Sequence, residues 1–107
     1  MRAVWLALGL AACASAPPER GPLDVEALIA DAPAYVASRY EPRELPDALV
    51  RDLETALFRC EPRGQATECA MTRHAFGSCF DVSMVRVSAT APVRAERNRR
   101  CMGVRPG

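Results

Sequence analysis

The chain of 107 residues has almost none of the residue arrangements on which enzyme chemistry usually depends. It contains one histidine, His74, no lysine and six glycines. Its sequence has no glycine-rich phosphate loop, no cluster of metal ligands and no interleaving of aromatic and basic residues that would stack nucleic acid. We therefore expect no cofactor, no metal and no nucleic-acid partner.

Proton transfer could in principle use His74 with Asp81 and either Ser78 or Ser83. The short spacing of these residues matches no nucleophile elbow, and nothing in the sequence supplies an oxyanion hole. Carboxylate pairs such as Glu41 with Glu44, or Asp52 with Glu54, are interpreted as chance neighbours at this density of charge. We interpret His74 as a loop or surface histidine and predict that the protein is not an enzyme.

The chain also lacks a hydrophobic run long enough to cross a membrane, which needs about 20 apolar residues. A shorter apolar run over residues 3–10 follows Arg2 and precedes a group of small residues. This order of a positive charge, a short apolar run and small residues is typical of an export signal.

The end of this segment, Leu10-Ala11-Ala12-Cys13, resembles the lipobox of bacterial lipoproteins. The resemblance implies a diacylglycerol on the thiol of Cys13, cleavage just before it, and acylation of the new amino group. Two or three acyl chains would anchor the protein stably. Ala14, by resemblance to the enterobacterial sorting rule, favours the periplasmic face of the outer membrane. We predict a signal peptide over residues 1–12, a lipidated Pro-rich tether over 13–22 and one small domain over 23–107.

An ordinary signal peptide is the alternative, because Ala12-Cys13-Ala14 and Ala14-Ser15-Ala16 both have the Ala-x-Ala pattern. Cleavage after Ala16 would place Pro17 where the protease needs an extended backbone. Cysteine parity favours the lipobox, since the chain has five cysteines and an exported protein would otherwise keep one unpaired.

The four other cysteines are predicted to form two structural disulfides, as suits a small exported domain. They are Cys60, Cys69, Cys79 and Cys101. The alternative is a zinc site, but these four cysteines include no C-x-x-C pair of the kind that zinc sites use. Three pairings are possible, and we predict Cys60 with Cys69 and Cys79 with Cys101, because the shorter loops close at lower entropic cost.

The turn between Cys60 and Cys69 leaves two alternatives open. A two-residue turn at Gly64-Gln65 sets the two cysteines opposite one another but leaves Pro62 inside a strand. A three-residue loop, Pro62-Arg63-Gly64, has better turn residues but puts the cysteines on opposite faces.

Apolar periodicity predicts helices in the first half of the chain. Asp24 can cap a short helix, a second short helical segment precedes Pro42, and a stronger helix runs from near Pro46 to about Phe58. One face of the stronger helix carries Leu45, Leu49, Leu53, Ala56 and Leu57. We expect the aromatic side chains of Tyr35, Tyr40 and Phe58 to fill the core.

The second half of the chain reads as extended structure. Phe80, Val82 and Met84 alternate with polar residues, and the apolar phase then shifts to Val85 and Val87, which predicts a β-bulge. Residues 93–104 fit a charged edge strand or a short helix, and we favour the strand. The predicted class is α+β: N-terminal helices followed by a small antiparallel sheet, stapled by two disulfides.

Charge is distributed unevenly along the chain. From Cys13 to Glu68 there are eleven acidic residues and six arginines, whereas from Cys69 to Gly107 there are two acidic residues and seven arginines. The positive end is concentrated in Arg94, Arg97, Arg99, Arg100 and Arg105. Guanidinium groups suit anionic lipid or an acidic envelope protein. The alternative is that the two halves neutralise each other or that these arginines form a solvated edge.

Together these patterns predict a non-enzymatic cell-envelope lipoprotein that acts as a small binding or assembly module. Its partners would be the membrane, through the lipid anchor, and anionic lipid or an acidic envelope protein. The alternative function is inhibition of a periplasmic or host hydrolase, in which the stapled loop from Glu61 to Glu68 would enter an active site.

Overall fold

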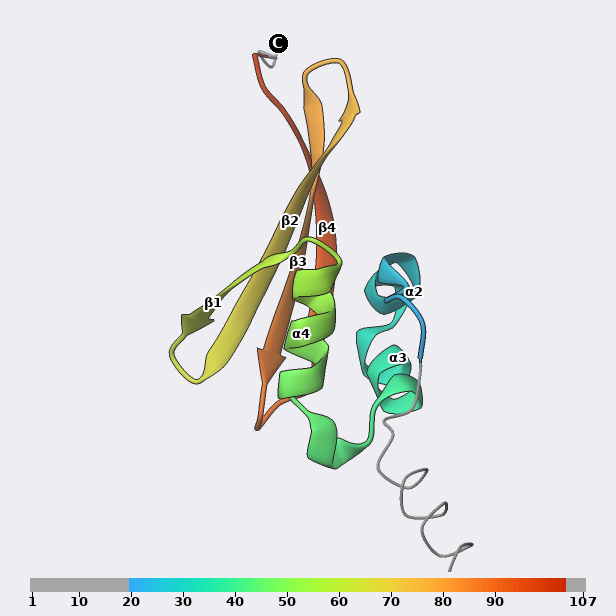
Figure 1. The fold of residues 1–107 in the computed structure, drawn as a ribbon. Coiled ribbons are helices and arrows are strands. Elements are labelled where there is room, and N and C mark those ends of the chain that lie inside the picture. Colours follow the sequence, from blue (N-terminus) through green and yellow to red (C-terminus); the bar gives the residue numbers. More distant parts are fainter. Residues whose placement is uncertain (1–19, 104–107) are drawn as a thin grey trace, which may run out of the picture.

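The computed structural model describes residues 20–103. Within this range, three α-helices and one 3-10 helix precede a four-stranded antiparallel sheet whose strand order follows the chain (Figure 1). The elements are α2 (Val25–Ala30), α3 (Ala32–Arg39), η1 (Pro42–Glu44), α4 (Asp47–Thr55), β1 (Arg59–Arg63), β2 (Ala66–Phe76), β3 (Cys79–Ser88) and β4 (Arg94–Cys101). The predicted α+β class is confirmed. The sequence of residues 93–104 fitted either an edge strand or a short helix. The structure has the strand β4 there.

Two aspartates begin the first two helices. The Asp24 carboxylate accepts a hydrogen bond from the Ala27 amide over 3.1 Å, and Asp31 caps α3 through the Ala34 amide over 3.2 Å. Each bond satisfies one of the amides that a first helical turn leaves without a partner. The cap predicted at Asp24 is therefore confirmed, and Asp31 separates two helices that the sequence pattern only partly resolved.

The third helix is shorter than predicted. Helix α4 ends at Thr55 rather than near Phe58, and the chain then passes through Leu57 with a φ of 75°. This reversal turns the Leu57 side chain out of the core, where it is 79% exposed, and turns Phe58 into it. The expectation that Leu57 lies on the buried helix face is wrong, because the apolar period continues past the point where the helix stops.

The core lies between the helices and one face of the sheet. Its buried members are Leu28, Ala32, Val36, Tyr40, Ala48, Leu49, Leu53, Phe58, Cys69, Val85, Val87 and Val93. Tyr40 and Phe58 belong to it as predicted, and Tyr35 packs against it partly buried. Because helices cover only this face, the sheet has one buried and one open side.

The prediction of a β-bulge in the segment that forms β3 is wrong. The strand pairs regularly with both neighbours, so that Ser83, Val85 and Val87 face the helices while Val82 and Met84 lie on the open face. The apolar phase shifts because the helix-side position at residue 83 holds a polar serine, not because the register slips. The one irregularity in these ladders lies in β2, between His74 and Phe76.

The two disulfides join Cys60 to Cys69 and Cys79 to Cys101, as predicted. Cys60 and Cys69 are directly opposite, which selects the two-residue turn at Gly64-Gln65. Their Cα atoms are 4.0 Å apart, the close spacing of a non-hydrogen-bonded antiparallel pair. Pro62 lies two positions further along the same edge strand, so its missing N–H points away from the ladder. The turn therefore accommodates a proline within β1.

The amino end of the described chain is held by Arg39. Its guanidinium donates to the carbonyl oxygen of Gly21 over 2.7 Å and to the Asp52 carboxylate over 3.3 Å. The buried Tyr40 hydroxyl also donates to Asp52, over 2.5 Å, and burial together with this bond raises the pKa of Tyr40. Residues 20–22, the last three of the expected tether, are thus fixed against α3 and α4.

Three strands extend past the helices. Figure 1 shows that the end of β2, the start of β3 and the end of β4 project beyond α2 and α4. We call residues 72–82 and 98–103, which lie beyond the level of the Arg97–Glu26 pair between β4 and α2, the arm. The Cys79–Cys101 disulfide staples this arm, with Cα atoms 3.8 Å apart. The arm lies at the end of the molecule opposite η1, and Arg20, at the start of the described chain, pairs with Glu44 of η1.

Candidate binding surfaces

The sheet separates His74 from two of the residues considered for proton transfer, Asp81 and Ser83. His74 donates from Nε2 to the carbonyl oxygen of Gly77 over 2.8 Å and lies on the open face beside Phe80. Asp81 faces the other side, where its carboxylate accepts two hydrogen bonds from Arg99. Ser83 is 1% exposed beneath the helices and accepts from Arg97 over 3.1 Å. The structure does not bring His74, Asp81 and Ser83 together, and it places His74 on the surface. Ser78 is exposed in the same turn as Gly77.

The arginines of the predicted positive end are divided between the two faces of β4. Arg97 and Arg99 lie on the helix side, whereas Arg94 and Arg100 lie on the open side. Arg97 pairs with Glu26 over 2.8 Å, and its hydrogen bond lowers the pKa of Glu26. Arg99 pairs with Asp81 over 2.8 Å and lowers the pKa of that carboxyl in the same way. The helix-side arginines are thus engaged within the fold.

Two of the predicted sites lie outside the described residues: Cys13, with the lipobox, and Arg105. The segment from Glu61 to Glu68 is a strand hairpin rather than an open loop, since only Gly64 and Gln65 stand outside β1 and β2. Arg63 pairs with both Glu61 and Glu68, at 3.1 and 3.5 Å. The end of the hairpin therefore consists of the two turn residues Gly64 and Gln65.

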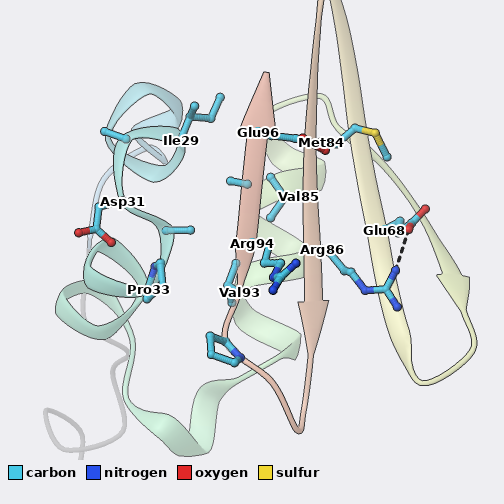
Figure 2. A pocket seen from close by; sticks show the side chains of 14 residues that line it. Ile29, Asp31, Pro33, Glu68, Met84, Val85, Arg86, Val93, Arg94 and Glu96 are labelled. Carbon is cyan, nitrogen blue, oxygen red and sulfur yellow. Dashed lines mark hydrogen bonds and ion pairs between the residues drawn. The ribbon is translucent and has the colours of Figure 1, made fainter. Parts of the chain in front are cut away.

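A hollow lies where the corner between α2 and α3 approaches β4. Its volume is about 740 Å³, and Figure 2 shows Ile29 and Pro33 on its helix side, with Val93, Arg94 and Glu96 on its strand side. Its strand side is apolar at Val93 and Val85. Its lining also includes side chains of the open face of the sheet, so the hollow extends around the edge at β4; these are Glu68, Met84, Arg86, Arg94 and Glu96. We call this hollow the edge groove.

A second hollow of about 450 Å³ adjoins the edge groove and shares Pro33, Pro92 and Val93 with it. It runs between α3 and the end of β3 and is lined mostly by apolar side chains, including Val36, Tyr40, Leu45 and Val87. The two hollows together give a groove with a polar rim at one end and an apolar lining at the other.

The backbone of β4 faces the edge groove with free hydrogen-bonding groups. Cys79 and Cys101 form a close, non-hydrogen-bonded pair, and every second residue along β4 repeats this geometry. Ala95, opposite Val85, is one of them, so its N–H and C=O point away from β3. Because β4 is the last strand of the sheet, no strand within residues 20–103 pairs with that side.

The sequence did not reveal this groove. The alternating charges of β4 indicated an edge strand, but the groove also needs the corner at Ile29–Pro33, which lies more than 60 residues earlier and reaches β4 only through the tertiary fold. The sequence does contain a signal for the helix corner that forms one wall of the groove. A short capped helix followed at once by Asp31 and Pro33 predicts a sharp corner between two helices.

Comparison of the chain with protein-family models, curated proteins and solved structures finds no match. Among the described residues, no helix combines the length and apolar character needed to cross a membrane. Within the same range, no three histidine, cysteine or acidic side chains are grouped so that they could hold a metal ion. The function is therefore inferred from the surfaces of this chain alone.

Proposed function

We propose that the protein is a non-enzymatic, lipid-anchored binding module of the bacterial cell envelope that docks an extended segment of a partner protein in the edge groove. The observation that carries this proposal is the unpaired backbone of Ala95 on β4, which faces a hollow walled by α2 and α3. An added strand would complete the sheet at this edge.

The chemistry of the groove favours a particular kind of segment. Its main chain would bond to Ala95, while alternate side chains would enter the apolar lining beside Val93. Arg94 is exposed at the rim, and among the described residues no carboxylate lies within ion-pair distance of it. An acidic residue in the partner segment would match this charge.

The covalent framework supports an exported setting for this activity. Disulfides persist in oxidising compartments such as the periplasm, and the two in this domain join all four cysteines after Cys13. Cys13 would then carry the acyl anchor, and the outer membrane facing the periplasm is the location that its neighbour Ala14 favours.

The test is to block the edge without changing the fold. Ala95→Pro removes the outward N–H but no ladder bond to β3, and Ala95→Val adds comparable bulk while keeping that N–H. A photo-crosslinking residue at the exposed Pro33 of the acylated full chain reports the occupant of the groove in cells. We expect a protein adduct that survives Ala95→Val and is lost in Ala95→Pro.

The same crosslinker at Leu57, which is exposed and lines neither hollow, is the positional control. Circular dichroism and thermal unfolding establish that both Ala95 variants are folded. Identical adducts from positions 33 and 57, or an adduct at 33 that Ala95→Pro leaves unchanged, would show that the groove is not the docking site.

A further inference from the structure

The end of the arm exposes large apolar side chains. Phe76 is 56% exposed and Met102 is 68% exposed, and with Leu57 they are the large hydrophobic residues that residues 20–103 leave open to water. The Met102 amide donates to the carbonyl oxygen of Ser78 over 2.9 Å, so the end of β4 is bound to the turn between β2 and β3. We call residues 76–78 and 102 the arm tip.

Cationic groups surround this apolar tip. Arg73 lies on the helix side of β2 and Arg100 on the open side of β4, and neither pairs with a carboxylate of the described chain. The Arg99 guanidinium lies over the Phe76 ring, 4.9 Å from its centroid, while it pairs with Asp81. The arm therefore carries three arginines against one carboxylate.

The opposite end of the molecule has the opposite charge. Residues 20–58, which form the helices, contain eight carboxylates and four arginines. The positive potential is thus concentrated at the end that also exposes Phe76 and Met102. Positive charge and exposed apolar side chains thus occur at the same end of the molecule. A basic edge that contacts only water would not account for the exposed aromatic and thioether side chains.

The tip is also preorganised. The Cys79–Cys101 disulfide joins β3 to β4 directly behind it, and the His74 side chain bonds to Gly77, which has a φ of 52°. Any residue other than glycine would have a strained backbone at position 77. A rigid tip loses little conformational entropy when it binds.

We propose that the arm tip binds the surface of an anionic phospholipid bilayer, with Phe76 and Met102 in the interfacial region and Arg73 and Arg100 on lipid phosphates. The arginines lie on opposite faces of the sheet, so they flank the apolar tip. A plane of phosphates entered by the tip matches this arrangement, whereas a protein patch bound to one face of the sheet would meet only one of them. This site is separate from the edge groove.

The acyl anchor restricts how such a contact forms. The segment from Cys13 to Arg20 spans at most about 25 Å when fully extended. Arg20 lies at the end opposite the arm tip. The tip therefore reaches the bilayer that holds the anchor only if the long axis of the domain tilts toward the surface.

The test uses the chain from residue 13 to 107 with Cys13→Ser, exported so that both disulfides form. The only tryptophan of the sequence, Trp5, lies before this segment. Phe76→Trp therefore gives a single reporter at the tip, and Leu57→Trp gives a matched reporter elsewhere. With vesicles of phosphatidylglycerol and phosphatidylcholine, we expect a blue shift and increased emission from position 76 only, and no change with phosphatidylcholine alone.

Charge variants test the role of the two arginines. An arginine near an anionic surface contributes about 1 kcal/mol, or roughly a fivefold change in partition. Arg73→Gln with Arg100→Gln should therefore weaken binding about 25-fold. The control pair, Arg43→Gln with Arg51→Gln, makes the same change in net charge at the acidic end and should leave binding nearly unchanged.

Absence of a shift at position 76 with the anionic vesicles would overturn the proposal. Equal weakening by the control pair would also overturn it, because binding would then follow net charge rather than the tip. In cells, a photo-crosslinker at position 76 that captures protein instead of lipid would assign the tip to a protein partner. None of these outcomes alters the result at Pro33, so failure of the lipid contact is distinct from failure of the proposed function.

Discussion

The Phe58 amide donates to the carbonyl oxygen of Leu53 over 2.9 Å, and these two residues are also packed together as buried members of the core. The Leu57 amide bonds to the carbonyl oxygen of Glu54 over 3.0 Å, which completes a Schellman motif at the end of α4. This motif requires a left-handed conformation at the residue just after the C-cap, which donates the shorter-range bond. Here that residue is Leu57 rather than glycine.

Leu57 should therefore be replaceable by glycine with a gain in stability. The left-handed conformation costs an L-residue about 1–2 kcal/mol, and the exposed leucine side chain contributes little burial in return. We expect Leu57→Gly to unfold at a higher urea concentration than Leu57→Ala, which keeps the strain while removing the side chain. In an ordinary helix position the order is reversed, with alanine more stable by about 1 kcal/mol.

Tyr40→Phe tests the hydrogen bond to Asp52. The tyrosine is 5% exposed, and its hydroxyl also accepts from Arg39 over 3.2 Å. Its loss leaves polar groups partly unsatisfied, and we expect the free energy of unfolding to fall by about 1–2 kcal/mol. Tyr35→Phe, whose hydroxyl bonds to the Asp24 amide at the surface, is the control and should cost less.

The raised pKa of Tyr40 gives this prediction a pH signature. A group whose pKa is higher in the folded state stabilises the fold below its unfolded pKa, and that contribution is lost as the pH rises above it. The stability difference between wild type and Tyr40→Phe should therefore shrink above about pH 10. A difference that stays constant through that range would contradict the assignment.

Local chemistry in the sequence was sufficient to predict several features of this fold. Asp24 as a cap, the α+β order of elements and both disulfide pairings follow from capping, periodicity and loop length. The end of α4 was missed because no glycine marks it. The edge groove and the arm tip depend on where the helices stop covering the sheet, which only tertiary packing determines.

The two disulfides should differ in their contribution to stability. Loop-closure entropy alone favours the Cys79–Cys101 bond by about 0.8 kcal/mol, since its sequence separation is 22 rather than 9. Cys69, however, is completely buried within the core cluster, whereas Cys79, though buried, lies outside that cluster. Serine at position 69 would bury a hydroxyl in the core at about 1–3 kcal/mol. We expect the paired change Cys60→Ser with Cys69→Ser to lower global stability more than Cys79→Ser with Cys101→Ser.

Hydrogen exchange separates the two effects. Loss of the Cys79–Cys101 bond should increase exchange mainly in the arm, because Cys101 is exposed and no helix packs there. Loss of the Cys60–Cys69 bond should increase exchange across the core strands. Peptide mapping without reduction gives the matching chemical check, and a peptide joining Cys60 to Cys79 or Cys101 would contradict the pairing.

The Asp81–Arg99 pair predicts a titration that can be observed directly. Arg99 lowers the pKa of the Asp81 carboxyl, first through its hydrogen bonds and then through its charge. Arg99→Gln should raise that pKa toward its ordinary value, as followed by carboxyl carbon NMR. The pair stabilises the fold above the unfolded pKa of aspartate, and this contribution is lost as the pH falls through the folded pKa. An unchanged pKa in the variant would show that the ion pair does not persist in solution.

Acylation of Cys13 is the prediction on which the cellular location depends. The thiol is the attachment atom implied by the lipobox Leu10-Ala11-Ala12-Cys13, so Cys13→Ser should abolish incorporation of a palmitate analogue. The variant should remain an uncleaved precursor or appear in the soluble fraction, because without acyl chains no stable anchor remains. The double change Cys79→Ser with Cys101→Ser is the control: it also removes cysteines, here the two of a disulfide, but it should still incorporate label. Unlabelled wild-type protein would leave cleavage at Ala12-Cys13-Ala14 as the better interpretation, with the domain exported in free form.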